Sequence, residues 1–417
     1  MNLKSKLPLR FQKYTSFGVI PKFFLAPVAL VIVILIILVR PILKIYIYKV
    51  DWPFGHFFVM PHFASHAHQL WNLTHRKKKL GIYCLASKSV SNQLVYKKFK
   101  QTVPIFKGNI GWILIKISQK IRFIGGKTSI IDFNGRNLNT SSRELHRKDD
   151  LIRFSNSEVN TCEEFLHNTG SSDRKGFVCV NFRDDLYNRS VSLIKKEYDI
   201  RNSEPQTYIA AAETLAEMGY TVFRMGAIVK EPLESKHPQV VDYATNGMRT
   251  ELLDIFLGAH CTFTISTGSG WDSVPTIFRR PLMFVNHLPV FAPSAATLPI
   301  VTYPKILLDN QTGSILSLKN LIDREIAHRA NSQAYKDAGV EIRDLSSEEL
   351  VDAVTEMAQR VEETFVETPK QKEMQAKLKH ILSTHPKLQP SPNYYPIRAQ
   401  FASCFLSRYP NFLDGLD

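Results

Sequence analysis

The 417-residue sequence lacks the short motifs that define several large classes of enzyme. It contains no G-x-S-x-G elbow, no H-E-x-x-H pair and no cysteine in a catalytic context, so no hydrolase nucleophile or zinc site is predicted. It also has no Walker A lysine and no G-x-G-x-x-G fingerprint. These absences weigh against hydrolysis and favour group transfer from an activated donor.

Cysteine is scarce, and its spacing excludes a disulfide framework. The five cysteines are odd in number and widely spaced, with no C-x-x-C pair, which fits a reduced compartment. Two of them, Cys179 and Cys261, lie in apolar runs where a thiol acts as a small buried hydrophobe. No zinc-finger spacing and no RNA-reading aromatic motif is present, so we expect no nucleic-acid partner.

Acidic residues are outnumbered by basic ones, with 53 Lys and Arg against 38 Asp and Glu and a net charge of +15. Such an excess favours anionic partners such as phosphate-bearing ligands and acidic lipid headgroups. The apolar fraction of 44% suits a globular protein, and two domains are the natural expectation at this length.

One long uncharged run, residues 23–39, predicts a membrane-associated helix near the start of the chain. As a helix it covers about 25 Å, against about 30 Å for the hydrocarbon core of a bilayer. Lys22 and Arg40 bracket the run and both flanks are basic, so the positive-inside rule sets no orientation. A spanning helix and a monotopic helix both remain open. The Arg40-Pro41 pair disfavours a cleaved signal peptide, because it replaces the small residues of a cleavage site.

Downstream, short apolar segments alternate with helical patterns, which predicts an α/β protein with parallel sheets covered by helices. In the first half we expect strands at 44–50 and 79–86, helices at 61–73 and 92–101, and a basic amphipathic stretch at 112–124 that packs on the sheet or lies on a membrane. In the second half we expect strands at 176–184, 220–226, 261–267 and 281–287 and helices at 157–167, 206–218, 249–257 and 346–365, the last opening with a capping box.

A change in composition sets the predicted domain boundary. Residues 125–150 turn to Gly, Asn, Ser, Arg and Asp, as linkers do. We therefore predict four parts: a basic N-terminus with the membrane helix (1–40), an N-terminal Rossmann-like domain (41–155), a C-terminal nucleotide-binding α/β domain (156–385), and a Pro-rich tail (386–417) that returns to the N-terminal domain.

The best candidate site is the segment TISTGSGWDSVP, residues 264–275. A strand is expected to end at Ser266, before a small turn made of Thr267, Gly268, Ser269 and Gly270. Such a turn lets backbone N–H groups approach phosphate oxygens at the start of a helix. An ordinary strand-to-helix turn explains the pattern equally well, and Asp272 fits a helix cap as well as a ligand.

Two arginines lie at the carboxyl ends of two predicted strands in the second half. Arg183 lies in VNFRD with Asn181, and Arg224 lies in VFRMG with Gly226. Open parallel sheets bind ligands at the carboxyl ends of their strands, where two arginines would neutralise a diphosphate. A surface ion pair is the alternative for either arginine. The nearby carboxylates either pair with them or bind ribose hydroxyls: Asp184, Asp185 and Asp242.

Histidines gather in the first half. His56 follows the first strand, where it could take a proton from an acceptor hydroxyl or serve as a structural histidine. His62 and His66 form an i, i+4 pair with His68 close by, but no carboxylate completes a ligand set. We therefore expect no metal site.

Motifs in order along about residues 40–412 resemble a family of bacterial glycosyltransferases associated with surface-polysaccharide genes. They are RPILKIYIYKV with Gly55-His56-Phe57, Arg201-Asn202-Ser203 with Tyr208, YTVFRMG, Asp242-Tyr243-Ala244, Leu253-Asp254-Ile255-Phe256, ISTGSGWDSVP, Arg280-Pro281 and Val285-Asn286. The resemblance implies a GT-B-like fold, in which two Rossmann-like domains face a cleft and the C-terminal one holds the donor. Metal is usually not required in such enzymes, and the sequence has no D-x-D motif.

The segment VNFRD is also similar to the H-x-R-x-x-D element of fucosyltransferases, in which the arginine holds the donor phosphate. Here Asn181 replaces the histidine and Leu186 the aspartate, so a GDP-fucose donor is not implied. The similarity supports a phosphate role for Arg183.

Residues and resemblance together predict a glycosyltransferase that moves a sugar from a nucleotide-sugar to a membrane-proximal, lipid-linked or polysaccharide acceptor. The resemblance implies a bacterial inner-membrane location, a cytoplasmic catalytic domain and no cofactor. The predicted catalytic residues are His56, Arg183 and Arg224, and the predicted donor-binding residues are Asn181, Arg183, Arg224, Gly226, Asp242, Ser266, Thr267, Gly268, Ser269, Gly270 and Asp272. The rivals are a glycerophosphate or other phospho-group transferase and a non-catalytic nucleotide-sugar-binding scaffold.

Overall fold

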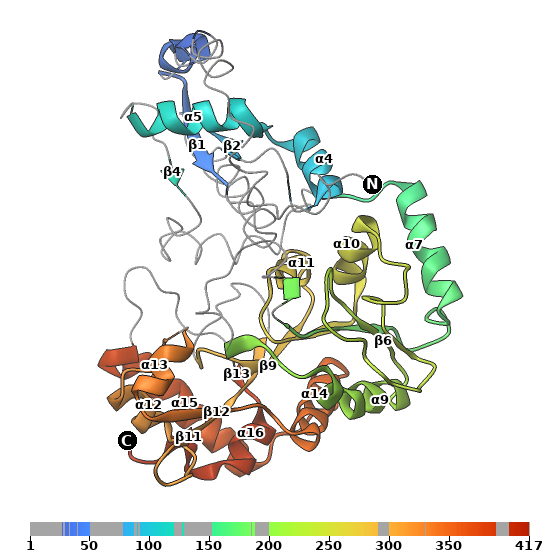
Figure 1. Cartoon of the computed structure of the whole chain (residues 1–417), viewed down its shortest axis with the longest axis vertical. Helices are drawn as coiled ribbons and strands as arrows, with labels where there is room; N and C mark the ends of the chain where they lie inside the picture. Colours follow the sequence, from blue (N-terminus) through green and yellow to red (C-terminus); the bar gives the residue numbers. More distant parts are fainter. Residues whose placement is uncertain are drawn as a thin grey trace, which may run out of the picture. The chain divides into compact units, whose positions relative to one another are not determined.

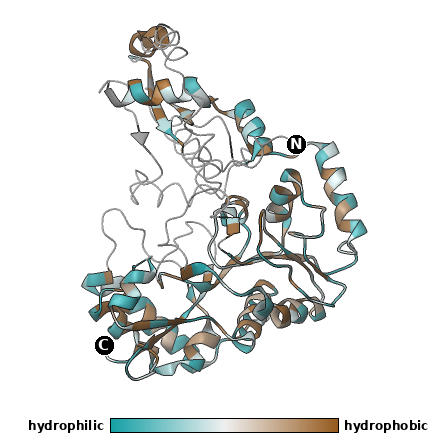
Figure 2. Ribbon diagram, viewed as in Figure 1, coloured by the Kyte–Doolittle hydropathy of each residue, from teal (hydrophilic) through white to brown (hydrophobic). Residues whose placement is uncertain are grey.

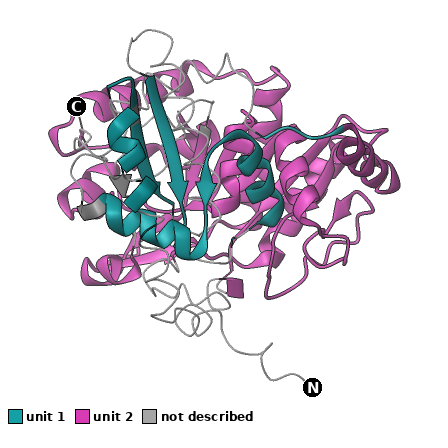
Figure 3. Cartoon of the chain, turned by 90° about the horizontal axis from the view of Figure 1, so that it is seen from above, with its two compact units in different colours: residues 1–155, 190–192 teal, residues 156–189, 193–417 magenta. Residues whose placement is uncertain are grey.

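A computed structural model describes residues 27, 30–32, 34–39, 41–50, 78–86, 90, 92–120, 127–128, 152–184, 186–187, 200–290, 300–329, 331–388 and 400–416. The chain divides into two compact units, coloured separately in Figure 3. Unit 1 comprises residues 1–155 and 190–192, and unit 2 comprises residues 156–189 and 193–417.

Unit 1 contains a four-stranded sheet in which every neighbouring pair is parallel (Figure 1). Its strands, in spatial order, are β3 (Ile105–Phe106), β2 (Lys78–Cys84), β1 (Leu43–Lys49) and β4 (Lys127–Thr128). Two helices accompany them, α4 (Gln93–Thr102) and α5 (Gly108–Lys120). The predicted strands at 44–50 and 79–86 and the helix at 92–101 are confirmed.

Helix α5 replaces the amphipathic stretch predicted at 112–124, and it packs on the sheet. Leu114 and Ile115 are buried against Ile47 of β1 and Cys84 of β2. Ile36, from the apolar run near the start of the chain, belongs to the same cluster. The packing alternative for this stretch is therefore confirmed.

The predicted membrane helix is described only in part. Residues 27, 30–32 and 34–39 are helical, and the rest of 1–40 lies outside the described residues. Over the part of the chain that the structure describes, no helix has both the length and the apolar character needed to cross a membrane. The helix predicted at 61–73 also lies outside the described residues.

Unit 2 is built on a seven-stranded sheet, and all of its neighbouring pairs are parallel. In spatial order the strands are β7 (Val240–Val241), β6 (Thr221–Arg224), β5 (Phe177–Asn181), β8 (Phe263–Ser266), β9 (Leu282–His287), β10 (Ile300–Pro304) and β13 (Gln400–Phe401). Counted along the chain, this order is 3-2-1-4-5-6-7. It is the doubly wound arrangement of nucleotide-binding domains, and its strand order reverses between β5 and β8.

Helices cover both faces of this sheet, because its strands carry apolar side chains on both faces and these must be shielded from water. Every residue of β5, β6, β8 and β9 is buried. Figure 1 shows α9 (Ile209–Glu217) and α10 (Glu251–His260) on opposite sides of the sheet. Helix α14 (Ser347–Val361) packs beside α9, and α7 (Asn156–Asn168) packs beside α10.

The remaining elements of unit 2 lie mostly after β9. They are η5 (Pro205–Tyr208), η6 (Gly270–Asp272), α11 (Ser273–Ile277), the antiparallel pair β11 (Ile306–Asp309) and β12 (Val340–Arg343), α12 (Leu318–Asp323), α13 (Ser332–Asp337), α15 (Pro369–Thr384), η7 (Pro386–Leu388), α16 (Ser403–Arg408) and η8 (Pro410–Leu413). The predicted capping box is confirmed at the start of α14, where Ser346 and Glu349 exchange hydrogen bonds.

The predicted return of the tail to the N-terminal domain is wrong for its described residues. Strand β13 pairs with β10 and so extends the sheet of unit 2. Phe401, Phe405 and Phe412 are buried in the core of that unit. Burial of these aromatic side chains on the large sheet explains why the tail joins unit 2.

Candidate functional site

The central strands of unit 2 bring the predicted site residues to one edge of the sheet. Because β6, β5 and β8 are adjacent and parallel, their carboxyl ends lie side by side. The backbone N–H of Thr267 donates to the Asn181 carbonyl at 3.1 Å. The N–H of Arg183 donates to the Thr267 hydroxyl at 2.9 Å. The segments after β5 and β8 are therefore joined at the point where the strand order reverses.

A buried carboxylate, Asp272, organises the turn after β8. It accepts hydrogen bonds from the Ser269 N–H at 2.6 Å, the Ser266 hydroxyl at 2.7 Å and the Asn181 amide at 3.3 Å. Burial raises the pKa of Asp272, and these hydrogen bonds oppose that shift because they favour the charged form. Ser269 is thus the N-cap of the helical turn η6, and Asp272 is its partner in a capping box that fixes the turn. Contact of Asp272 with a donor stays a prediction.

The turn satisfies its own backbone donors. Besides the N–H groups of Thr267 and Ser269, the Gly268 N–H donates to the Ser266 hydroxyl at 3.0 Å, and the Trp271 N–H donates to the Ser269 hydroxyl at 3.1 Å. In this structure the N–H groups of residues 267–269 therefore already have acceptors within the protein, and the predicted contact of these N–H groups with a phosphate stays a prediction. Contact between a donor and other atoms of this turn stays a prediction.

Arg183 differs from Arg224 in that it makes no ion pair with any residue that the structure describes. The side chain is half-buried, and its guanidinium has no ion pair or hydrogen bond among the described residues. Burial lowers the pKa of Arg183, while Asp272 and Asp184 oppose the shift from a distance. The Asp184 carboxylate is held by the backbone N–H groups of Leu186 and Lys230. An external anion would therefore find an unpaired cation here.

Arg224 is the last residue of β6, and its side chain is fully buried. Its Nη1 contacts an Asp242 oxygen at 3.1 Å, and its guanidinium lies 4.9 Å from the ring centre of Phe182. Asp242 also accepts from the Leu233 N–H and the Thr245 hydroxyl. The ion-pair alternative therefore describes Arg224 and Asp242, and direct contact of either with a donor stays a prediction.

Two of the three glycines of the predicted site, Gly226 and Gly268, lie close to protein side chains. A Cβ on Gly226 would lie 2.5 Å from Val229 Cγ1. Gly268 has φ +94°, and a Cβ there would lie 2.5 Å from the His287 ring. Because glycine has no Cβ, Val229 and the His287 ring can pack closely against the backbone at these two positions.

His287 and Arg201 also belong to this site, and the sequence motifs did not assign them a role. His287 is buried at the end of β9 close to Gly268, and its Nδ1 has no hydrogen-bond partner in the part of the chain that the structure describes. Burial, together with the positive charges of Arg201 and then Arg183, holds the pKa of His287 well below its ordinary value. Arg201 Nε donates to the Leu288 carbonyl at 2.8 Å. Arg201 lies in the Arg-Asn-Ser motif of the family resemblance, which was the available signal.

The predictions made for the first half fall outside this description. His56, His62, His66 and His68 lie outside the described residues, as does Asp185. Within the ranges that the structure describes, no group of three or more His, Cys, Asp or Glu side chains could hold a metal ion.

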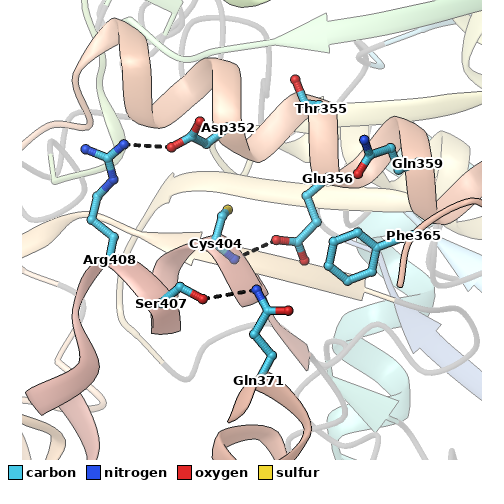
Figure 4. A pocket seen from close by; sticks show the side chains of 9 residues that line it. All are labelled: Asp352, Thr355, Glu356, Gln359, Phe365, Gln371, Cys404, Ser407 and Arg408. Atoms are coloured by element: carbon cyan, nitrogen blue, oxygen red, sulfur yellow. Dashed lines mark hydrogen bonds and ion pairs between the residues drawn. The ribbon is translucent and has the colours of Figure 1, made fainter. Parts of the chain in front are cut away.

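A shallow pocket of about 600 Å³ lies elsewhere in unit 2, between α14, α15 and α16 (Figure 4). Its polar side chains already have partners, since Arg408 pairs with Asp352 and Gln371 donates to Ser407. Glu356 accepts from the N–H groups of Ser403 and Cys404. The pocket supplies no uncompensated charge comparable to Arg183.

Comparison with known proteins gave low-similarity structural matches. No protein-family model matches the chain, and no curated protein matches it. The glycosyl transferase family 9 structure from Veillonella parvula matches with 10% identity and a TM-score of 0.40, covering 76% of this chain and 97% of that one. The ADP-heptose LPS heptosyltransferase II of E. coli matches with 12% identity and a TM-score of 0.34, covering 58% and 84%. The iron-containing dodecameric glycosyltransferase TibC of E. coli matches with 12% identity and a TM-score of 0.31, covering 61% and 60%. At TM-scores this low, the matches carry no argument about activity.

Proposed function

We propose that the protein is a GT-B-like glycosyltransferase that transfers a sugar from a nucleotide-sugar donor to a lipid-linked or polysaccharide acceptor near a membrane. The observation that carries the proposal is the half-buried Arg183, which makes no ion pair within the described ranges and lies at the point where the strand order of unit 2 reverses. Doubly wound sheets bind nucleotides in the crevice outside this point. The diphosphate of a nucleotide-sugar supplies the anion that Arg183 lacks.

In this proposal Arg183 stabilises the charge that develops on the departing nucleotide diphosphate. A preorganised cation at a site of developing charge lowers the barrier, because little reorganisation is needed during the reaction. The turn at 266–272 forms one wall of the donor site, and Asp272 keeps it in shape. Arg224 then acts as a positioning residue, because its pairing with Asp242 fixes the segment after β6.

The base that activates the acceptor stays a prediction. His56 is the candidate from the sequence, and it lies outside the described residues. His287 is a poor candidate, since burial keeps its ring away from solvent and depresses its pKa. No metal or cofactor is required by the proposed role of Arg183.

Substitution of Arg183 tests the proposal. Binding of UDP-, GDP-, ADP- and CMP-sugars to the purified full chain is measured by thermal shift and titration calorimetry. For the sugar that binds, Arg183→Gln should weaken binding and turnover by about 10²–10³-fold, as loss of one such donor group does, with no loss of stability. The matched control is Arg408→Gln, which breaks two partly exposed ion pairs between α16 and α14, with Glu348 and Asp352, and should leave binding unchanged.

Unchanged donor binding and turnover in Arg183→Gln would overturn the proposal. The phospho-group transferase alternative is separated by mass spectrometry of the product, because a transferred sugar and a transferred phosphoglycerol differ in mass. A scaffold would bind the donor without modifying any acceptor.

A further inference from the structure

The positive charge of the chain is concentrated in unit 1. Residues 1–131 contain 21 Lys and Arg and a single acidic residue, Asp51. The remaining residues contain 32 Lys and Arg against 37 Asp and Glu, so they are net negative. The net charge of +15 therefore arises from the sequence that forms the sheet of unit 1 and precedes it. Such a segment is electrostatically complementary to an anionic surface.

An exposed aliphatic surface lies on the same unit. In the N-terminal apolar helix (residues 30–39), Ile32 and Ile36 face the core of unit 1 beside Ile47 and Leu114. The other described side chains of this helix are between 38% and 67% exposed: Leu30, Val31, Ile34, Leu35, Ile37, Leu38 and Val39. Figure 2 shows this helix in the brown of hydrophobic residues. Soluble surfaces rarely expose a continuous aliphatic patch of this kind, which marks an interaction site.

Basic and apolar residues meet where this helix joins the sheet. Ile42, which follows the helix, is 75% exposed. Leu43, the first residue of β1, is paired in register with Lys78, the first residue of β2, and Lys79 follows it. Aliphatic side chains beside lysines match the boundary between acyl chains and anionic headgroups.

We infer that the N-terminal apolar helix inserts into one leaflet of an anionic bilayer and does not cross it. Its Ile32–Ile36 side is packed on the unit's own sheet, so residues 30–39 are not available to span the hydrocarbon core as a free helix. Only seven residues of the uncharged run, 23–29, precede them, and as a helix these cover about 10 Å of the required 30 Å. A monotopic attachment uses the exposed side and leaves the packed side in place. An RNA partner would be attracted by the positive charge but would make no contact that requires the exposed aliphatic side chains.

This inference concerns unit 1 and goes beyond the proposed chemistry, which concerns unit 2. Lipid binding can therefore fail while donor binding succeeds, and the reverse. The two failures are distinguished by measuring nucleotide-sugar binding in the same preparations.

Vesicle flotation of the full chain tests the lipid surface. Binding is expected to phosphatidylcholine vesicles that contain phosphatidylglycerol, and to be at least tenfold weaker for vesicles of phosphatidylcholine alone. The double variant Leu35→Asp, Leu38→Asp should lose at least tenfold in binding, because two exposed aliphatic side chains become charged. The matched control is Val366→Asp in unit 2, where the side chain is 81% exposed and no change is expected. Leu35→Ser, Leu38→Ser serves as the second variant if the aspartates impair folding.

Thiol labelling tests the topology. Ser5→Cys, before the helix, and Ser314→Cys, at an exposed position of unit 2, are labelled with a membrane-impermeant maleimide in sealed membrane vesicles. A monotopic helix leaves both cysteines on the same side, so both are labelled in the same vesicle orientation. Labelling on opposite sides would show a spanning helix and overturn the inference. Failure to float with anionic vesicles, with or without binding to RNA, would also overturn it.

Discussion

Replacement of Asp272 tests how the turn after β8 is held. The carboxylate accepts two short hydrogen bonds, from the Ser269 N–H at 2.6 Å and from the Ser266 hydroxyl at 2.7 Å. The Asn181 amide is a third, longer donor at 3.3 Å. Asp272→Ala leaves these donors without their acceptor in a buried place, where an unpaired polar group is costly.

The expected loss follows from these contacts. A hydrogen bond to a charged group contributes about 1.5–3 kcal/mol, so the two short bonds contribute about 3–6 kcal/mol. Part of this is offset, because the variant no longer buries a carboxylate whose pKa is raised by burial. We therefore expect a net loss of about 3 kcal/mol in the free energy of unfolding. For a domain of this size that corresponds to a Tm lower by about 6–12 °C.

Urea and thermal denaturation of the full chain measure the effect. Asp272→Asn keeps one acceptor oxygen and should fall between the wild type and Asp272→Ala. Ser273→Ala is the control in the same segment, because it removes only the neutral hydrogen bond from the Ser273 hydroxyl to the Gly270 carbonyl and should cost about 1 kcal/mol. A loss below about 1 kcal/mol in Asp272→Ala would refute the assignment of Asp272 as the residue that holds the turn.

Two further predictions concern the neighbours of this turn. Gly268→Ala should lower the free energy of unfolding by more than about 2 kcal/mol, because the alanine is strained at positive φ and its Cβ lies 2.5 Å from the His287 ring. The control is Gly313→Ala, which is also at positive φ but has no atom within 4 Å of the added Cβ. It should lower the free energy of unfolding by only about 1 kcal/mol in the same urea titration. The depressed pKa of His287 predicts full stability above about pH 6.5 and a loss of stability as the pH falls, since the unfolded chain then binds a proton that the folded chain does not. His287 should contribute up to about 1.4 kcal/mol per pH unit to the slope of the unfolding free energy against pH, and His287→Gln should lack this contribution. Equal slopes for the wild type and the variant would contradict the prediction.

The large parallel sheet of unit 2 was predictable in its centre and not at its edges. Strands β5, β6, β8 and β9 are buried on both faces, so each one is a continuous apolar run in the sequence. Strands β7 and β13 have two residues each, which is too short for any periodicity. They form because their backbone groups pair with a neighbouring strand, β6 for β7 and β10 for β13, and the local sequence does not encode this pairing. The tail was misplaced for the same reason.

The site was predictable in position but not in the roles of its residues. Arg183 lies two residues after β5 and Arg224 is the last residue of β6, and their sequence contexts alone do not show which of them binds a phosphate. The structure distinguishes them by burial and partner: Arg224 is enclosed and paired with Asp242, whereas no carboxylate pairs with Arg183 among the described residues. Likewise the sequence of the Gly-Ser-Gly turn does not show whether its N–H groups are free. In the structure the Ser269 N–H donates to Asp272 and the Gly268 N–H donates to the Ser266 hydroxyl.

The two proposals predict separable defects, which makes each a control for the other. Arg183→Gln removes a cation from unit 2 and should lower sugar transfer by about 10²–10³-fold while flotation on anionic vesicles stays unchanged. Leu35→Asp, Leu38→Asp alters the exposed side of the N-terminal apolar helix and should abolish flotation while binding of a soluble nucleotide-sugar stays unchanged. If the acceptor is carried by a lipid, the second variant should also lose transfer to the membrane-borne acceptor but keep transfer to a soluble analogue of it. Loss of both transfers with donor binding intact would instead place the helix in the catalytic machinery and contradict its assignment as a membrane contact.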